Sequence, residues 1–315
     1  MELKRVVVTG LGALTPIGNS VNEYWESLVN GVSGAAPIKQ FDASKFKTQF
    51  ACELKDFNVQ DHLDRKEARK LDQFSQYAMV STAEAMADSG IDVDKIDLSK
   101  AGVIWGSGIG GLKTFQDEAA SFAKGDGTPR YNPFFIPKMI ADIAAGHISI
   151  KYGFRGPNYV TVSACASANN AMIDAFNLIR LNKANVIISG GSEAAVNESG
   201  IGGFNALRAL STRNDSPQTA SRPFDKNRDG LVPSGGAATL ILETYESAVK
   251  AYNSSLDAFK NAEERYDLDV MNLYDFQQVK NTLFASQSRV LSSKYDYIFK
   301  TLILKFYQGE ALTLN

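Results

Sequence analysis

The chain has 315 residues, of which 44% are hydrophobic and 22% are charged, and this is the composition of an ordinary globular protein with one or two cores, not of a disordered one. The formal net charge of −2 gives no overall field that would favour nucleic acid or an anionic membrane surface. Two cysteines, Cys52 and Cys165, are too few for a disulfide framework and fit a reducing compartment.

The N-terminus leads directly into a β-branched run at residues 6–8, without the apolar segment and cleavage site of a signal peptide. No apolar stretch reaches the roughly 20 residues that a membrane span needs. We therefore expect a cytoplasmic protein with no membrane partner and no nucleic-acid partner.

Five short Val/Ile-rich runs alternate with longer helical patterns and glycine turns over the first 250 residues. They predict strands at residues 5–8, 101–104, 158–161, 185–188 and 238–242. Strands that alternate with helices in this way are typical of an α/β fold.

The glycine-rich opening, Gly10-Leu-Gly-Ala-Leu-Thr15, has some of the spacing of a dinucleotide-binding fingerprint. Thr15 stands where the third glycine is needed, and Pro16 follows it directly. We therefore expect no nicotinamide cofactor, and no other cofactor or metal is expected either.

The composition changes abruptly near residue 250. All nine prolines lie at or before Pro233, and every glycine except Gly309 lies before residue 251. Beyond the change, apolar residues recur every seven positions in two series, Tyr252, Phe259 and Tyr266, then Phe276, Leu283, Val290, Tyr297 and Leu304. A polar break at residues 267–272 separates the series, so the pattern predicts an α-helical hairpin. A helical appendage packed on the parent domain is the alternative.

The segment Val162-Ser-Ala-Cys165-Ala-Ser-Ala-Asn-Asn170 follows a predicted strand and precedes an amphipathic run at residues 171–181. Cys165 is therefore expected where a strand turns into a helix. The free amides and the positive dipole end of a helix N-terminus stabilise a thiolate and can hold an oxyanion, so a cysteine there is nucleophilic without an adjacent base. A lone cysteine is also commonly a small buried hydrophobe, and the position alone leaves both interpretations open.

Neighbouring motifs bear on that choice. In chain order they are Arg5-Val-Val-Val-Thr-Gly-Leu-Gly-Ala-Leu-Thr-Pro-Ile-Gly18, Trp105-Gly-Ser-Gly-Ile-Gly-Gly111, Asn132-Pro-Phe-Phe-Ile-Pro137, Ala145-Gly-His-Ile-Ser-Ile-Lys-Tyr-Gly-Phe-Arg-Gly-Pro-Asn158, the Cys165 segment, Gly190-Gly-Ser-Glu193, Gly202-Gly-Phe-Asn-Ala-Leu-Arg-Ala-Leu-Ser-Thr-Arg-Asn214 and Ser221-Arg-Pro-Phe-Asp-Lys-Asn-Arg-Asp-Gly230. Up to about residue 248, the chain resembles the N-terminal half of a β-ketoacyl-(acyl-carrier-protein) synthase II, an elongating condensing enzyme of the thiolase superfamily. The resemblance implies a layered thiolase-like fold with a mixed five-stranded sheet.

The resemblance also implies a role in fatty-acid biosynthesis for several residues. Cys165 would accept the acyl group as a thioester, and its backbone N–H would supply half of the oxyanion hole. Ile109 and Phe204 match positions that line the family's acyl tunnel, although plain core packing also explains them. The strand near residues 158–161 matches the dimer contact of the family, which predicts a homodimer.

A basic run, Arg65-Lys-Glu-Ala-Arg69-Lys70, matches the region where the family meets its acidic carrier protein. The resemblance thus implies acyl-carrier protein as the partner of Arg65, Lys66, Arg69 and Lys70. A solvated helix face of mixed charge is the alternative.

The family's condensation step uses two histidines, a lysine and a glycine-rich Phe loop from its C-terminal half. His62 and His147 stand in neither of the family's histidine motifs, and His147 matches a structural position. We therefore expect a chain that can be acylated but cannot condense malonyl groups. A hydrolase that pairs Cys165 with either histidine is a further alternative.

From about residue 250 the chain resembles the last helical hairpin of a TolC-type outer-membrane efflux protein, with Asp269 where that family usually has a glycine. We therefore expect two domains, a thiolase-like ketosynthase unit at residues 1–248 and an α-helical hairpin at residues 249–315. A non-catalytic interaction protein and a chimeric sequence artefact are the alternatives to a synthase-derived enzyme.

Overall fold

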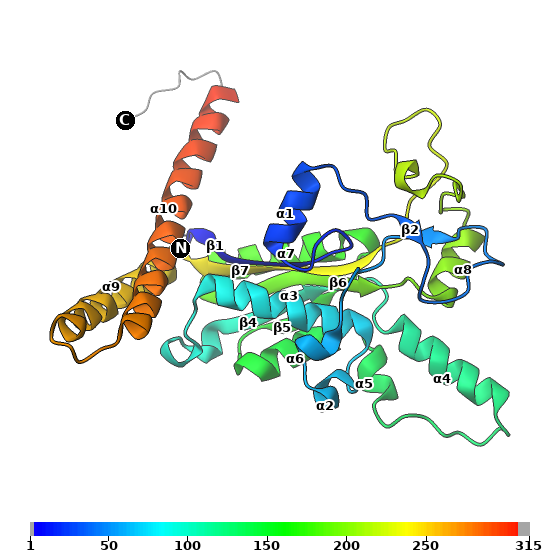
Figure 1. Cartoon of the computed structure of the whole chain (residues 1–315), viewed down its shortest axis with the longest axis horizontal. Helices are drawn as coiled ribbons and strands as arrows, with labels where there is room; N and C mark the ends of the chain where they lie inside the picture. The colour runs from blue at the N-terminus through cyan, green and yellow to red at the C-terminus, as the bar shows by residue number, and fades with distance from the viewer. Residues whose placement is uncertain (1–2, 308–315) are drawn as a thin grey trace.

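The computed structural model describes the backbone of residues 3–307 and the side chains of these residues except those at 289 and 292–307 (Figure 1). Its strands are β1 (Val6–Leu14), β2 (Ala36–Pro37), β3 (Phe50–Ala51), β4 (Ala101–Gly106), β5 (Asn158–Thr161), β6 (Val186–Ala194) and β7 (Gly235–Thr244). Its α-helices are α1 (Val21–Val29), α2 (Arg65–Ala68), α3 (Gln73–Ser89), α4 (Leu112–Lys124), α5 (Phe135–Met139), α6 (Ile143–Tyr152), α7 (Ser167–Arg180), α8 (Glu198–Ala206), α9 (Tyr245–Asp267) and α10 (Leu273–Tyr307).

Five strands form one mixed sheet in the order β1-β7-β6-β4-β5. Strand β4 is parallel to both β5 and β6, whereas β7 is antiparallel to β6 and to β1. Each of the five strands covers or overlaps one of the Val/Ile-rich runs, so the prediction of an α/β fold with a mixed five-stranded sheet is confirmed.

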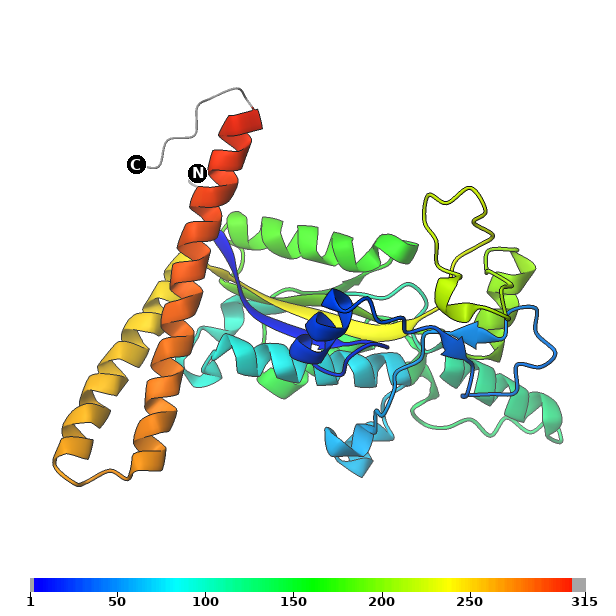
Figure 2. The same cartoon turned by 45° about the horizontal axis from the view of Figure 1, so that its top comes forward.

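Helices cover the two faces of the sheet, and Figure 2 shows α3 and α7 on opposite sides. Helices α3 and α6 pack on one face, where Trp105 and Phe74 belong to the larger apolar core. Helix α7 packs on the other face, against Ile104 and Ile187. Ile104 and Trp105 are neighbours in β4, so the alternation of side chains along a strand sends them into different cores.

The ends of α3 follow from local capping. Asp72 is its N-cap and accepts a hydrogen bond from the Phe74 N–H at 3.3 Å. The same carboxylate accepts one from the Thr114 N–H at 3.0 Å, which ties α3 to the start of α4. Gly90 ends α3 at a φ of 57°, in the left-handed region that glycine adopts without strain.

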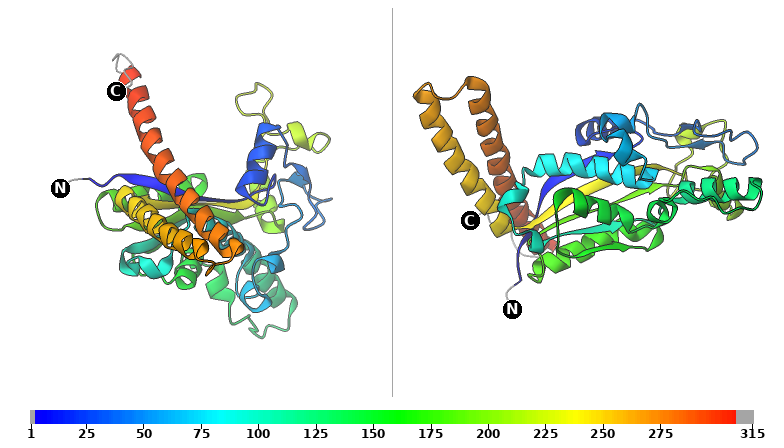
Figure 3. Two further views of the ribbon diagram at one scale, coloured as in Figure 1. Left: turned by 60° about the vertical axis from the view of Figure 1, so that its left-hand side comes forward. Right: turned by 90° about the horizontal axis from the view of Figure 1, so that it is seen from below.

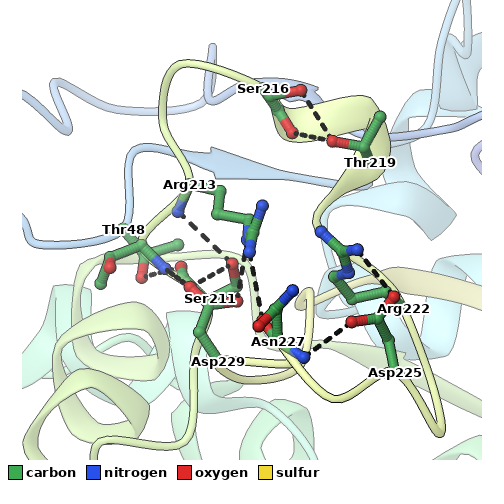
Figure 4. Close-up of polar contacts among 10 residues, drawn as sticks. Thr48, Ser211, Arg213, Ser216, Thr219, Arg222, Asp225, Asn227 and Asp229 are labelled. Atoms are coloured by element: carbon green, nitrogen blue, oxygen red, sulfur yellow. Dashed lines mark hydrogen bonds and ion pairs between the residues drawn. The ribbon is translucent and has the colours of Figure 1, made fainter.

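The segment after α8 is held by side-chain contacts, as Figure 4 shows. Asp229 accepts hydrogen bonds from the Ser211 hydroxyl at 3.0 Å and from the Thr212 N–H at 3.1 Å. Arg213 lies 3.5 Å from the other oxygen of Asp229. These contacts join the two ends of a loop that carries two of the sequence motifs.

Helices α9 and α10 pack against each other at the end of the sheet opposite α4 and α8 (Figure 3). The Phe276 ring lies 4.6 Å from the Tyr266 ring and 5.6 Å from the Phe259 ring, measured between centroids. The side chains of Tyr297 and Leu304, the last positions of the heptad series, lie outside the described residues.

Helix α9 starts directly after β7 and contacts the two residues that precede β1. Arg5 stacks on the Tyr245 ring at 4.5 Å, and Lys4 forms an ion pair with Glu246 at 3.2 Å. A cavity of about 550 Å³ lies beside this junction. Over the described part of the chain, no helix is both long and apolar enough to cross a membrane.

Candidate active site around Cys165

Cys165 lies in a single 3-10 turn, Ala164–Ala166, between the end of β5 and the first residue of α7. This is the strand-to-helix junction that the sequence predicts for it. Its side chain is exposed, and Ala164 before it has a φ of 50°, an uncommon value for a residue with a Cβ. The turn thus presents the thiol at the surface of the described chain.

Hydrogen bonds fix the thiol-bearing turn, residues 163–167, against the start of α7. The Ser163 N–H donates to the Ser167 hydroxyl at 2.9 Å, and that hydroxyl donates to the Ala164 carbonyl at 2.7 Å. Asn170, one helical turn further on, donates to the Ser163 hydroxyl at 2.6 Å. The residue types of the Cys165 segment therefore build the turn as well as carrying the cysteine.

The start of α7 is arranged to favour negative charge near the turn. Ala166 is its N-cap and has no side-chain oxygen that could bond to the first-turn amides. The Ser167 N–H donates to the Ala164 carbonyl, and no side chain of the N-cap competes for the amides that follow. The positive end of the helix dipole can therefore stabilise a thiolate or an oxyanion near the turn.

Two glycines bring α7 close to the ends of β4 and β6. A Cβ on Gly106 would overlap the Ala168 backbone nitrogen, and a Cβ on Gly191 would lie 2.7 Å from the Ala168 Cβ. Only glycine at both positions allows this approach without displacement of the helix. The motifs that contain them thus position the turn of Cys165.

Ile109 and Phe204 occupy different surroundings. Ile109 belongs to the glycine loop, residues 107–111, and the residue is 41% exposed. Phe204 lies on α8 and packs against a separate apolar cluster that includes Ile201 and Phe46. The described residues therefore do not join them in one core cluster.

The basic run forms α2 and the two residues that follow it. Asp64 caps this short helix by accepting from the Lys66 N–H at 2.7 Å, while Ala68 and Leu71 anchor it in the core. The basic side chains are all exposed, and none takes part in an ion pair among the described residues; they are Arg65, Lys66, Arg69 and Lys70.

Neither histidine lies on the elements that form the turn of Cys165. The His62 ring stacks on Phe57 with the centroids 5.6 Å apart. His147 is on α6, where burial lowers its pKa and the negative charge of Glu67 partly opposes that effect. No described hydrogen bond joins either ring to Cys165, and the second cysteine, Cys52, is half-buried with its pKa raised by burial.

Two residues that hold the glycine loop, residues 107–111, were not singled out by the sequence. Glu193, at the end of β6, accepts a hydrogen bond from the Gly108 N–H at 2.7 Å, and Ser107 accepts one from the Gly110 N–H at 3.1 Å. The signal in the sequence is a carboxylate directly after Gly190-Gly-Ser, at the end of a buried strand. Among the described residues, no group of three or more His, Cys, Asp and Glu side chains could hold a metal ion.

Residues 3–248 match the family model of the β-ketoacyl synthase N-terminal domain. The 3-oxoacyl-[acyl-carrier-protein] synthase 2 of Synechocystis sp. is 47% identical over 249 residues, which are 79% of this chain and 60% of the relative. The corresponding synthase of Staphylococcus aureus is 46% identical over 245 residues, 78% of this chain and 59% of the relative. The chain thus spans about three fifths of the length of the curated relatives it matches.

Solved structures show the same likeness. A β-ketoacyl synthase from Burkholderia phymatum has a TM-score of 0.70 and 31% identity over 79% of this chain and 61% of its own. The ishigamide ketosynthase/chain length factor has a TM-score of 0.66 and 29% identity over 79% and 60%. A type II polyketide synthase acyl-carrier protein in complex with its ketosynthase has a TM-score of 0.60 and 25% identity over 78% and 64%.

Proposed function

This chain belongs to the β-ketoacyl synthase family, and we propose from this premise that its synthase part takes an acyl group from acyl-carrier protein onto Cys165. The Cys165 thiolate attacks the carbonyl carbon of the carrier thioester. A new carbon–sulfur bond forms to Cys165, the bond to the carrier thiol breaks, and the carrier leaves as a thiolate that takes up a proton. The backbone N–H of Cys165 supplies one donor to the oxyanion.

One observation carries this proposal. The thiol of Cys165 is exposed in a turn at the N-terminus of α7, where the N-cap residue, Ala166, has no side-chain acceptor. Cys52, by contrast, is half-buried, and burial raises its pKa. The acyl group is therefore expected on Cys165 alone.

The placement of the two histidines supports a second part of the proposal, that this chain by itself does not condense malonyl groups. Condensation removes CO₂ from a malonyl thioester, and the enolate that results needs donors beside the cysteine. His62 stacks on Phe57 and His147 lies on α6, so neither is on an element that forms the turn. Without such donors the acyl-enzyme accumulates.

Exposed charge supports the choice of acyl-carrier protein as the partner. Arg65, Lys66, Arg69 and Lys70 are free of ion pairs among the described residues, so an acidic carrier can approach them without displacing a partner. Strand β5 is at the edge of the described sheet and pairs with β4, which supports a homodimer formed through this edge.

The composition change near residue 250 supports a division into a synthase unit, residues 1–248, and a helical unit, residues 249–315, although α9 runs across this boundary. We keep the resemblance of the second unit to a TolC-type hairpin, and a cytoplasmic location, as proposals. The second candidate function is a non-catalytic protein that binds a synthase or a carrier protein. It is favoured by the same histidine placement.

Intact-mass spectrometry of the purified chain after incubation with an acyl-carrier-protein thioester tests the proposal. We expect one acyl group per chain, lost in Cys165→Ala and retained in Cys52→Ala. Addition of malonyl-carrier protein should yield no ketoacyl product. An unmodified wild-type chain would overturn the acyl-transfer proposal and favour the binding protein, whereas a ketoacyl product would overturn the predicted defect.

A further inference from the structure

The carboxylate of Glu193 is bound by a loop that precedes it by 85 residues. Its Oε2 accepts a hydrogen bond from the Gly108 N–H at 2.7 Å, and its Oε1 lies 3.4 Å from the Ser107 hydroxyl. Ser107 is buried, at 2% exposure, and its hydroxyl accepts a hydrogen bond from the Gly110 N–H at 3.1 Å. Glu193 thus holds the start of the glycine loop, residues 107–111, and the Ser107 hydroxyl links that start to Gly110 within the loop.

The electrostatics of Glu193 agree with this geometry. Burial raises the pKa of its carboxyl group, and the backbone amides of Gly108, Ile109 and Gly110 partly oppose that effect. Amides of the loop have thus replaced part of the water around the carboxylate. If the loop moved away, a partly buried acceptor would lose its donors, so loop and carboxylate stabilise each other's position.

The glycine loop also lies close to the turn of Cys165. A Cβ on Gly108 would lie 3.0 Å from the Glu193 Oε2 and 3.5 Å from the carbonyl oxygen of Ala164. Gly108 therefore stands between the carboxylate and the residue that precedes Cys165. The next residue, Ile109, is an exposed apolar residue of this loop.

We infer that Glu193 is a positioning residue, which fixes the glycine loop against the turn of Cys165 and so sets where Ile109 stands relative to an acyl group on that turn. The inference rests on the proposed acyl transfer to Cys165. It assigns Glu193 no contact with the substrate. Its effect is on which acyl groups the site accepts.

Three reactions of Cys165 separate positioning from general damage. In Glu193→Gln, one oxygen acceptor of the loop amides is replaced by an amide donor. We expect acylation from a dodecanoyl-carrier thioester to slow by about tenfold, the effect of weakening one hydrogen bond to a charged group. Acylation from an acetyl-carrier thioester and alkylation by iodoacetamide, which place no long chain against Ile109, should change by less than about twofold.

Glu243→Gln is the control, because Glu243, like the half-buried Glu193, is a glutamate of the sheet that accepts a hydrogen bond. Glu243 is buried and accepts from the Thr9 hydroxyl at 2.5 Å. Glu243, on β7, pairs with Val186 at the start of β6, whereas Glu193 lies near the end of β6 and pairs with Gly236. Seven residues of strand, about 23 Å, separate the two sites. All three reactions should keep their wild-type rates in this control.

Ser107→Ala provides a second variant if Glu193→Gln does not fold, because it deletes only the bridging hydroxyl. Ser107→Ala should lower the rate of acylation from the dodecanoyl-carrier thioester by about threefold and leave the other two reactions unchanged. In its control, Ser189→Ala, all three reactions should keep their wild-type rates.

The outcomes are distinguishable. A wild-type chain that is not acylated at all contradicts the proposed function itself. If the wild type is acylated and Glu193→Gln behaves as Glu243→Gln does, or slows all three reactions equally, the positioning role is wrong.

Discussion

The two faces of the five-stranded sheet differ in how completely helices cover them. On the face of α3 and α6, Trp105 and Phe74 are fully buried within the larger core. On the face of α7, that helix packs through Ala171, Ala175 and Ile179 on a smaller core. The helix that follows the turn of Cys165 thus lies on the less covered face.

The register of β1 locates the uncovered part. Val8 pairs with Leu242 and Leu11 pairs with Leu240, and directly paired residues point to the same face. Leu242 and Leu240 belong to the core beneath α7, yet Val8 is 47% exposed and Leu11 is 42% exposed. Helix α7 lies mainly over β6 and β4, so it leaves β1 in contact with solvent. Val8 and Leu11 are therefore expected to contribute less to stability than their partners on β7.

The largest expected change in the free energy of unfolding comes from truncating one buried helix residue on each face. Phe74 on α3 and Ile179 on α7 are both fully buried. Phe74→Ala should lower the free energy of unfolding by about 4 kcal/mol and Ile179→Ala by about 2.5 kcal/mol, because the cavity left in the open face is more easily filled by rearrangement. Urea unfolding followed by circular dichroism measures both. An Ile179→Ala loss equal to that of Phe74→Ala would remove the distinction between the faces.

A smaller effect comes from two neighbours in β1. Val7 is 6% exposed and Val8 is 47% exposed, and they point to opposite faces. Val7→Thr should lower the free energy of unfolding by about 1.5 kcal/mol, because it buries a hydroxyl without an arranged partner. Val8→Thr should change it by less than about 0.5 kcal/mol.

Each of these two substitutions is the control for the other, since the chemical change and the strand are the same. The measurement is again urea unfolding. Equal losses at both positions would mean that the α7 face is closed over β1 by some other part of the protein in solution.

Most of the sheet could be predicted from the sequence because its strands are local patterns. The run at residues 158–161 coincides with β5, and the position of Cys165 follows from the strand before it and the helix after it. Strand β6 extends beyond its predicted run to Ala194, through Gly190 and Gly191. These glycines have no apolar pattern, and pairing with β4 and β7 keeps them in the sheet.

The role of Glu193 could not be predicted, for a physical reason. Its contact with Gly108 depends on the parallel pairing of β4 with β6, which brings the ends of two distant strands together. A local pattern records the Gly-Gly-Ser-Glu sequence but not which loop lies opposite. The difference in burial between the two faces could not be predicted either. Val7 and Val8 are the same residue type, so the sequence does not show which of them is covered by a helix.

The smallest effect tests a polar residue in the smaller core. Ser189 is fully buried on β6, opposite Ile104 and Leu240, and its hydroxyl has no hydrogen-bond partner among the described residues. Removal of a buried hydroxyl without a partner relieves a desolvation cost and leaves only a small void. Ser189→Ala should therefore raise the free energy of unfolding by up to about 1 kcal/mol, whereas Ser81→Ala, which deletes a hydroxyl bonded to Thr239 at 2.8 Å on the α3 side, should lower it by about 1 kcal/mol. Urea unfolding of the two variants gives the sign directly. A loss in Ser189→Ala would show that this hydroxyl is satisfied in solution, and the α7 face would then be wetter than its apolar residues suggest.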